Sequence, residues 1–186
     1  ALGFGFIEVG TVTPKPQSGN PKPRLFRLPK DHALINRMGF NNEGMKALKR
    51  RLENFRDKNP NSDMQIGINI GKNKTTPNED AASDYLKCYE HLYSLADFFV
   101  VNVSSPNTPN LRELQNKDEL KKIISGLIDY RKRQEGSKPL YLKIAPDLTF
   151  TQLDEIISLQ NELGFEGIVA TNTSIDRTLI KNTRET

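Results

Sequence analysis

Short apolar segments recur along this chain, and stretches with helical periodicity lie between them. Five segments rich in Ile, Val and Phe predict strands at residues 6–12, 65–70, 98–103, 140–144 and 167–171. They lack a clean polar and apolar alternation, which is typical of strands covered on both faces of a parallel sheet. Apart from the longer separation between the first two, their spacing of roughly 30 to 40 residues favours repeated βα units.

Apolar stripes between these segments predict the helices. The strongest stripe shares one helical face and comprises Leu120, Ile123, Ile124, Leu127 and Ile128. Similar stripes lie within residues 45–55, 85–93 and 153–163. Thr149, with Gln152 three residues later, matches a capping box before the last stripe, and Gly164 matches a helix stop after it.

A parallel sheet of βα units can close into a (β/α)₈ TIM barrel or stay open as a doubly wound sheet. The open dinucleotide-binding form needs a glycine-rich turn after its first strand, and no G-x-G-x-x-G follows any predicted strand. The sequence therefore favours the α/β class and a TIM barrel. Because such barrels take about 250 residues, residues 1–186 are expected to hold about five central βα units of one domain.

Composition narrows the classes of function. A single cysteine, Cys88, excludes an internal disulfide framework and is expected to pack as a small core residue. The two histidines, His32 and His91, lack the spacing of metal ligands, so no metal site is expected. Lys and Arg total 27 against 23 Asp and Glu, and a net charge of +4 is too small to indicate a nucleic-acid partner.

The segment after the first predicted strand is unusually rich in proline. Residues 14–30 contain five prolines and five basic side chains. We interpret residues 14–40 as a long, irregular surface excursion. A polyproline ligand and a loop that contributes to a functional site are the alternatives.

Polar side chains stand at the carboxyl ends of the predicted strands, where (β/α)₈ barrels place their active sites. They are Thr11, Asn69, Asn102, Lys143, Thr171, Asn172 and Thr173. An amide offers a donor and an acceptor together, so the set favours a flat ligand such as a pyrimidine or a flavin over simple turn capping. Lys143 has apolar neighbours, which favours an anionic or electron-rich ligand over a surface lysine.

Residues 102–109 (NVSSPNTP) form the densest polar cluster and directly follow a predicted strand. Neither histidine stands at a strand end and no G-x-S-x-G is present, which disfavours a Ser-His-Asp hydrolase. The composition of this cluster also fits an ordinary Ser/Pro turn, so the residues alone leave its chemistry open.

Six stretches run through nearly the whole chain in the order of one known family. They are residues 3–17 (GFGFIEVGTVTPKPQ), 36–42 (NRMGFNN), 67–74 (GINIGKNK), 102–108 (NVSSPNT), 143–148 (KIAPDL) and 170–173 (ATNT). With them the chain resembles dihydroorotate dehydrogenases of the quinone-dependent, membrane-associated class. The resemblance implies an FMN-containing (β/α)₈ barrel that oxidises dihydroorotate to orotate in pyrimidine biosynthesis and passes the electrons to a membrane quinone.

The resemblance also implies roles for individual residues. Ser105 matches the catalytic base that removes the C5 proton while a hydride leaves C6, and a serine here rather than a cysteine points to the quinone class. Thr108 and Phe40 match the proton relay that a weakly basic hydroxyl needs. The matches to substrate contacts are Asn36, Arg37, Met38, Gly39, Phe40, Asn102, Asn107, Asn172 and Thr173. The matches to FMN contacts are Thr11, Asn69, Asn102, Lys143 and Thr171.

Asn110 replaces the family's usual glycine in the loop over the substrate, and because Asn tolerates positive φ we expect altered loop motion with the chemistry retained. The family's first barrel strand and its membrane-docking segment are expected before Ala1, and its last two strands after Thr186. The resemblance implies a peripheral location on the cytoplasmic face of the inner membrane, through a segment outside this chain. A related FMN barrel with a soluble acceptor and a non-catalytic basic binding module are the alternative functions.

Overall fold

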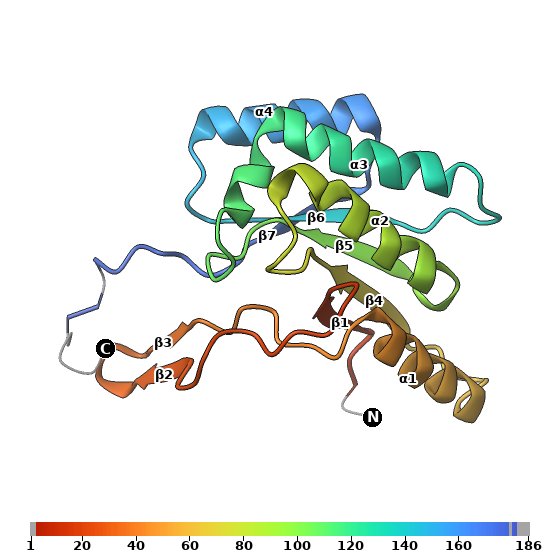
Figure 1. The fold of residues 1–186 in the computed structure, drawn as a ribbon, viewed down its shortest axis with the longest axis horizontal. Coiled ribbons are helices and arrows are strands. Elements are labelled where there is room, and N and C mark those ends of the chain that lie inside the picture. The colour runs from red at the N-terminus through yellow and green to blue at the C-terminus, as the bar shows by residue number, and fades with distance from the viewer. Residues whose placement is uncertain (1–2, 179, 182–186) are drawn as a thin grey trace.

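The computed structural model describes residues 3–178 and 180–181, and its centre is one parallel sheet (Figure 1). The strands are β1 (Phe6–Val12), β4 (Gln65–Ile70), β5 (Phe98–Asn102), β6 (Leu140–Ile144) and β7 (Gly167–Ala170), and they pair in this order. All four pairings are parallel. The five predicted strands are therefore present, although β5 and β7 each end one residue earlier than predicted, which leaves Val103 and Thr171 in the loops that follow.

Four helices connect successive strands and lie on one face of the sheet (Figure 1). They are α1 (Met45–Lys58), α2 (Ala81–Leu92), α3 (Lys117–Arg131) and α4 (Phe150–Leu163). Short 3-10 turns are η1 (Pro29–Asp31), η2 (Asn78–Asp80), η3 (Tyr93–Leu95) and η4 (Leu111–Gln115). The capping box at Thr149 and the left-handed Gly164 after α4 confirm both predicted helix ends.

The hydrophobic core lies between the sheet and the helices. Side chains such as Ile68, Phe99 and Leu142 are fully buried against the helix stripes. Cys88 lies in the same core, as expected, and burial raises the pKa of its thiol, which keeps it protonated. In the part of the chain that the structure describes, no helix is long and apolar enough to cross a membrane.

The inner face of the sheet differs from the helix-covered face. A hollow of about 760 Å³ lies against this face near the amino ends of the strands, and Phe6, Phe98 and Tyr141 line it. Phe6 is 59% exposed. The prediction of strands covered on both faces therefore holds for β4 and β5, which are buried on successive residues. It is wrong for the outer strands β1 and β7, whose residues are mostly exposed or half-buried. The inner face of the described residues carries polar side chains toward the carboxyl ends, such as Asn69 and Asn102.

Residues 14–40 contain a hairpin that the sequence analysis missed. Strands β2 (Leu25–Leu28) and β3 (Ala33–Asn36) pair antiparallel, with η1 and a left-handed His32 between them. Each strand has only four residues, and prolines flank β2, so alternation is too short to separate from a loop. The hairpin projects away from the sheet (Figure 1), and the interpretation as an irregular excursion is wrong for these two segments.

Candidate active site

Hydrogen bonds join the polar side chains at the carboxyl ends of β1, β4 and β5. Asn102 donates from Nδ2 to Thr11 Oγ1 at 2.9 Å, and Thr11 Oγ1 donates to Asn69 Oδ1 at 2.7 Å. Asn69 donates from Nδ2 to Glu8 Oε1 at 2.7 Å. An ionised carboxylate only accepts hydrogen bonds. Glu8 therefore fixes which way the amide of Asn69 points.

The same chain of hydrogen bonds continues across the loops after β5 and β7. Ser104 donates to Asn102 Oδ1 from its backbone nitrogen at 3.2 Å and from its hydroxyl at 3.0 Å. Asn172 donates from Nδ2 to Ser104 Oγ at 3.1 Å. A single directional series therefore runs from the loop after β7 to Glu8 on β1, and it includes four predicted site residues.

Ser105 lies in a largely buried position on the loop after β5. Its side chain is 5% exposed, and its Oγ accepts a hydrogen bond from the backbone nitrogen of Asn107 at 3.3 Å. Asn107 donates in turn from Nδ2 to Asn36 Oδ1 on β3 at 3.2 Å. The hairpin therefore contributes directly to this cluster, which favours the third reading of the proline-rich segment, a loop that helps to form a site.

Thr108 carries a buried hydroxyl with no hydrogen-bond partner among the described residues. The residue is 3% exposed. Leaving such a group unpaired costs about 1–3 kcal/mol, and the hydroxyl of Tyr89 in the hydrophobic core is in the same state. Asn110, further along the loop, has a φ of 55°, which lies in the left-handed region that asparagine tolerates; the altered loop motion stays a prediction.

Other predicted residues lie at the edge of the cluster. Arg37 donates from Nε and Nη2 to the carbonyl of Pro23, and its guanidinium lies 5.1 Å from the Phe26 ring centre. The carbonyls of Gly39 and Phe40 accept from Gln17 Nε2. Met38 is half-buried and Thr171 is exposed. The structure therefore uses Arg37 to hold the hairpin, and the roles of Arg37 and Met38 in substrate binding stay predictions.

Lys143 lies beside Asn102 in the register of β5 and β6. It is half-buried, and within the described ranges the structure gives its ammonium no hydrogen-bond or ion-pair partner. An unpaired cation beside a row of amides and a hydroxyl fits the edge of a flavin, which presents alternating carbonyl and N–H groups. The chemistry of Thr11, Asn69, Asn102 and Lys143 thus matches the group that the sequence predicted.

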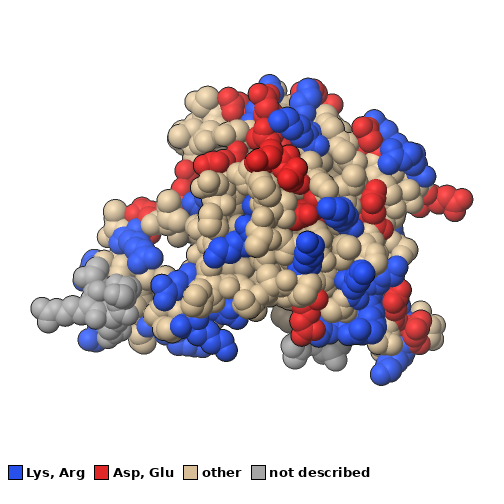
Figure 2. Space-filling model, in the orientation of Figure 1, with Lys and Arg blue, Asp and Glu red and all other residues tan. Residues whose placement is uncertain are grey.

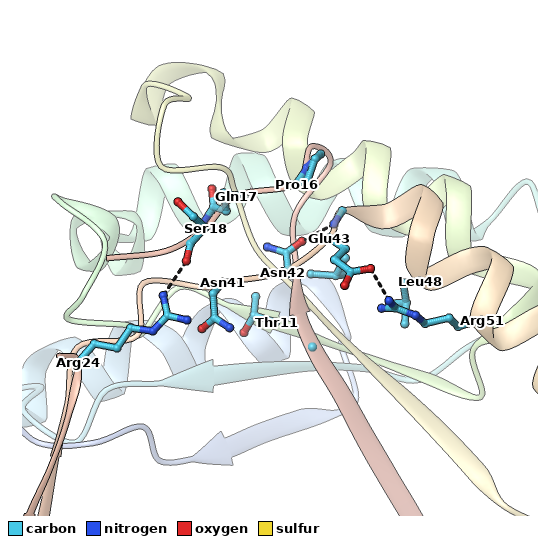
Figure 3. A pocket seen from close by; sticks show the side chains of 13 residues that line it. Thr11, Pro16, Gln17, Ser18, Arg24, Asn41, Asn42, Glu43, Leu48 and Arg51 are labelled. Carbon is cyan, nitrogen blue, oxygen red and sulfur yellow. Dashed lines mark hydrogen bonds and ion pairs between the residues drawn. The ribbon is translucent and has the colours of Figure 1, made fainter. Parts of the chain in front are cut away.

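Two hollows lie near these residues. One of about 710 Å³ opens beside Thr11, between the start of α1 and the proline-rich segment (Figure 3). Its charged groups already have protein partners, since Arg24 donates to the carbonyl of Ser18 and Arg51 contacts Glu43. Thr11 is the one predicted site residue among its lining residues. We therefore do not assign this hollow to the predicted ligand.

The second hollow is smaller, about 390 Å³, and lies between the hairpin and the loop after β7. Three residues predicted to contact substrate line it, namely Asn36, Asn107 and Thr173. They come from β3, from the loop after β5 and from the loop after β7. This hollow is the better candidate for the substrate end of the site.

Sequence reasoning missed several residues of this cluster. Glu8 carries a usable signal, because a charged residue inside a predicted strand is the same observation that singled out Lys143. Ser104 is one residue from the predicted base but was given no role of its own. Arg112 and Asp147, which form an ion pair at 2.9 Å near the loop after β7, carry no local sequence signal.

Comparison with known proteins places these observations in a family. A family model described as dihydroorotate dehydrogenase matches residues 1–186. The chain is 56% identical over 182 residues to a dihydroorotate dehydrogenase (quinone) of Christiangramia forsetii, covering 98% of this chain and 52% of that protein. It is 56% identical over 177 residues to one of Mycolicibacterium smegmatis, covering 95% and 47%. The chain thus spans about half the length of the curated relatives it matches.

Solved structures agree with the predicted architecture. The chain is similar to the crystal structure of DHODH in complex with ferulenol from Eimeria tenella, with a TM-score of 0.89 and 42% identity. The match covers 97% of this chain and 54% of that one. The predicted fold class is confirmed: the five parallel strands and their helices form part of a (β/α)₈ barrel.

Proposed function

This chain belongs to the dihydroorotate dehydrogenase family, and on that premise we propose that residues 1–186 form the central part of a single FMN-binding barrel that oxidises (S)-dihydroorotate to orotate. Residues 1–2, 179 and 182–186 lie outside the described residues. The observation that carries the proposal is the row of hydrogen-bonded amides and hydroxyls beside buried Ser105. Its alternating donors and acceptors suit the imide edge of a pyrimidine.

The proposed reaction removes a proton from C5 and a hydride from C6 of dihydroorotate, which leaves the C5=C6 double bond of orotate. Ser105 takes the proton. A serine hydroxyl is a weak base, so it needs surroundings that exclude water and a route for the proton. The burial of Ser105 and the unpaired hydroxyl of Thr108 on the same loop support this role.

The remaining predicted residues bind the two flat molecules. FMN, when bound, supplies the hydride acceptor, and Thr11, Asn69, Asn102, Lys143 and Thr171 are the residues that would hold it. Asn36, Asn107, Asn172 and Thr173 would hold the pyrimidine ring. Asn102 belongs to both sets, because its amide and that of Asn172 are linked through Ser104.

A membrane quinone is the proposed final electron acceptor, and the pathway is de novo pyrimidine biosynthesis. On one face of the hairpin, Leu25 (50% exposed) and Leu34 (53% exposed) flank Arg27, and Asn36 on the same face reaches Asn107. A quinone is an apolar ring that carries carbonyl groups. The leucines of this hairpin face would contact the ring, and Arg27 could donate hydrogen bonds to a carbonyl group. Peripheral attachment to the cytoplasmic face of the inner membrane is part of the proposal.

Substitution of Ser105 tests the proposed base. In the full-length protein, Ser105→Ala should slow anaerobic flavin reduction by dihydroorotate by about 100- to 10,000-fold, the usual contribution of a general base. Orotate affinity and flavin content should change little, because within the described residues Ser105 accepts a single hydrogen bond, from the backbone nitrogen of Asn107. Stopped-flow absorbance of the flavin measures the rate, and an orotate titration measures the affinity.

The neighbouring serine provides a matched control. Ser104→Ala removes the hydroxyl that joins Asn102 to Asn172, so it should weaken orotate binding more than it lowers the limiting rate. If Ser105→Ala instead reduces its flavin as fast as the wild type, the assignment of the base is wrong.

A further inference from the structure

Arg112 connects the loops that follow three neighbouring strands. It donates from Nε to the carbonyl of Ser104 at 3.1 Å and from Nη2 to the carbonyl of Thr173 at 3.0 Å. Its Nη1 donates to Asp147 Oδ2 at 2.9 Å. Ser104 follows β5, Asp147 follows β6 and Thr173 follows β7. One guanidinium therefore contacts the loops after three neighbouring strands.

Asp147 strengthens the connection to the loop after β7. Its Oδ1 accepts from the hydroxyl of Ser174 at 2.5 Å, and its carboxylate also accepts from the backbone nitrogen of Ile175. Partial burial raises the pKa of Asp147, but the hydrogen bonds from Ser174 and Arg112 outweigh it and hold that pKa below its ordinary value. The carboxylate is therefore ionised at neutral pH and remains a partner for Arg112.

The two carbonyl contacts lie next to residues with proposed roles in the reaction. Ser104 precedes Ser105 in the chain, and Thr173 is a proposed contact of the pyrimidine ring. Asn172 makes a second connection between the same two loops through the hydroxyl of Ser104. The position of the base relative to the pyrimidine-binding loop is thus set by contacts at Ser104 from two sides.

We propose that Arg112 is a positioning residue that sets the separation between Ser105 and the pyrimidine-binding loop after β7. The inference rests on the proposed function for the roles of Ser105 and Thr173. A planar guanidinium presents several donors in fixed directions, whereas an ammonium is a compact charge that cannot reproduce them. Lysine at this position keeps the ion pair with Asp147 and loses the simultaneous hold on both carbonyls.

Arg131 offers a control of the same chemical kind at the opposite end of the sheet. It donates to the carbonyls of Lys138 and Gly164 and to the carboxylate of Glu166. These partners lie before β6 and β7, at the amino ends of the strands. Arg131→Lys therefore disturbs a comparable set of contacts without touching the proposed site.

The test compares the two lysine variants in the full-length, flavin-loaded protein. Arg112→Lys should weaken orotate binding and slow flavin reduction by dihydroorotate, each at least roughly tenfold, because a misplacement of about 1 Å can cost about 100-fold in rate. Flavin content should be retained. Arg131→Lys should lower the temperature of thermal unfolding and leave orotate affinity and the reduction rate within about twofold, as expected for a change remote from the site.

Two outcomes separate this inference from the proposed function. If dihydroorotate fails to reduce the wild-type flavin, the proposed function fails, and the inference with it. If the wild type is reduced and Arg112→Lys matches it in rate and orotate affinity, the positioning role alone is overturned. Equal losses in Arg131→Lys would also overturn it, because they would show a general effect on the fold.

A second variant covers the case in which Arg112→Lys does not fold. Asp147→Asn preserves the shape of the side chain and leaves both carbonyl contacts of Arg112 in place. Orotate affinity should fall by roughly threefold, which is less than the loss expected when the guanidinium is removed. The flavin should be retained. Unchanged orotate affinity in Asp147→Asn, measured on a folded protein, would then overturn the inference.

Discussion

Two buried threonines near the site differ in how their hydroxyls are used. Thr13, which is fully buried, donates to the carbonyl of Lys15 at 2.8 Å and accepts from Asn42 Nδ2 at 2.8 Å. Thr108 is equally inaccessible, but its hydroxyl has no partner among the described residues. At the scale of single residues, this difference distinguishes a hydroxyl that holds the fold from one that makes no hydrogen bond to the described residues.

Replacing each threonine by valine tests that distinction. Thr13→Val should lower the free energy of unfolding by about 1–3 kcal/mol, because it leaves buried partners unsatisfied. Thr108→Val should leave stability unchanged or slightly higher and should slow flavin reduction by dihydroorotate. Thermal unfolding and stopped-flow absorbance measure the two effects. A large loss of stability in Thr108→Val with an unchanged reduction rate would mean that its hydroxyl is structural.

At the scale of secondary structure, the order of the strands in the sheet determines which polar side chains become neighbours at the site. The side chains of β1, β4 and β5 form a directional hydrogen-bond chain that ends at Glu8. A carboxylate only accepts and a backbone N–H only donates, so Glu8 orients the amide of Asn69 and the backbone nitrogen of Ser104 orients the amide of Asn102. The arrangement requires the strands to be adjacent, which the sheet order provides.

Glu8→Gln should therefore weaken FMN binding without a matching loss of stability. A glutamine can donate as well as accept, so the amide of Asn69 loses its fixed orientation. We expect FMN affinity to fall roughly 3- to 10-fold, equivalent to about one hydrogen bond. Glu43→Gln, which changes an exposed carboxylate beside Arg51, is the control. Fluorescence titration of the apoprotein with FMN measures both, and equal affinities in the two variants would contradict the role of Glu8.

The same scale shows what the sequence could predict. The α3 stripe and the capping box at Thr149 follow from local spacing, and both are confirmed. The hairpin was missed because strands of four residues flanked by proline carry too little periodicity.

Residues that act through distant partners were harder to predict. Arg112 bonds to Thr173, 61 residues further along the chain, and nothing in its immediate neighbours signals that contact. Asn36 and Ser105 were singled out by the family resemblance, whereas Asn172 was also predicted from its place at a strand end, and the structure places all three in one hydrogen-bonded region. Their roles in binding and catalysis stay predictions.

Charge is distributed unevenly over the whole molecule. Residues 14–40 hold six Lys or Arg and one Asp. The net positive charge of this segment therefore exceeds the net charge of +4 for the full chain. Figure 2 shows basic side chains along the lower edge of the molecule, over the proline-rich segment, the hairpin and α1. Both proposed ligands are anions, a carboxylate and a phosphate, so this edge should speed their association and make it sensitive to salt.

The sheet itself supports the proposal that these residues are the central part of a barrel. Among the described residues, β1 pairs with β4 alone and β7 with β6 alone, so each outer strand presents an unpaired edge. The chain also spans about half of its relatives. A closed barrel would pair those edges and cover the hollow beside Phe6 and Phe98 on the inner face.

The most direct test of the central claim is an anaerobic titration of the full-length protein with dihydroorotate. The account predicts that the protein binds one flavin, that about one equivalent of dihydroorotate bleaches its absorbance, and that an equal amount of orotate forms. If the bound flavin keeps its absorbance in excess dihydroorotate, the assignment of the barrel fold is unaffected and the proposal that dihydroorotate is the substrate is contradicted. A full-length protein that holds no flavin would contradict the enzyme altogether and favour the binding-module alternative.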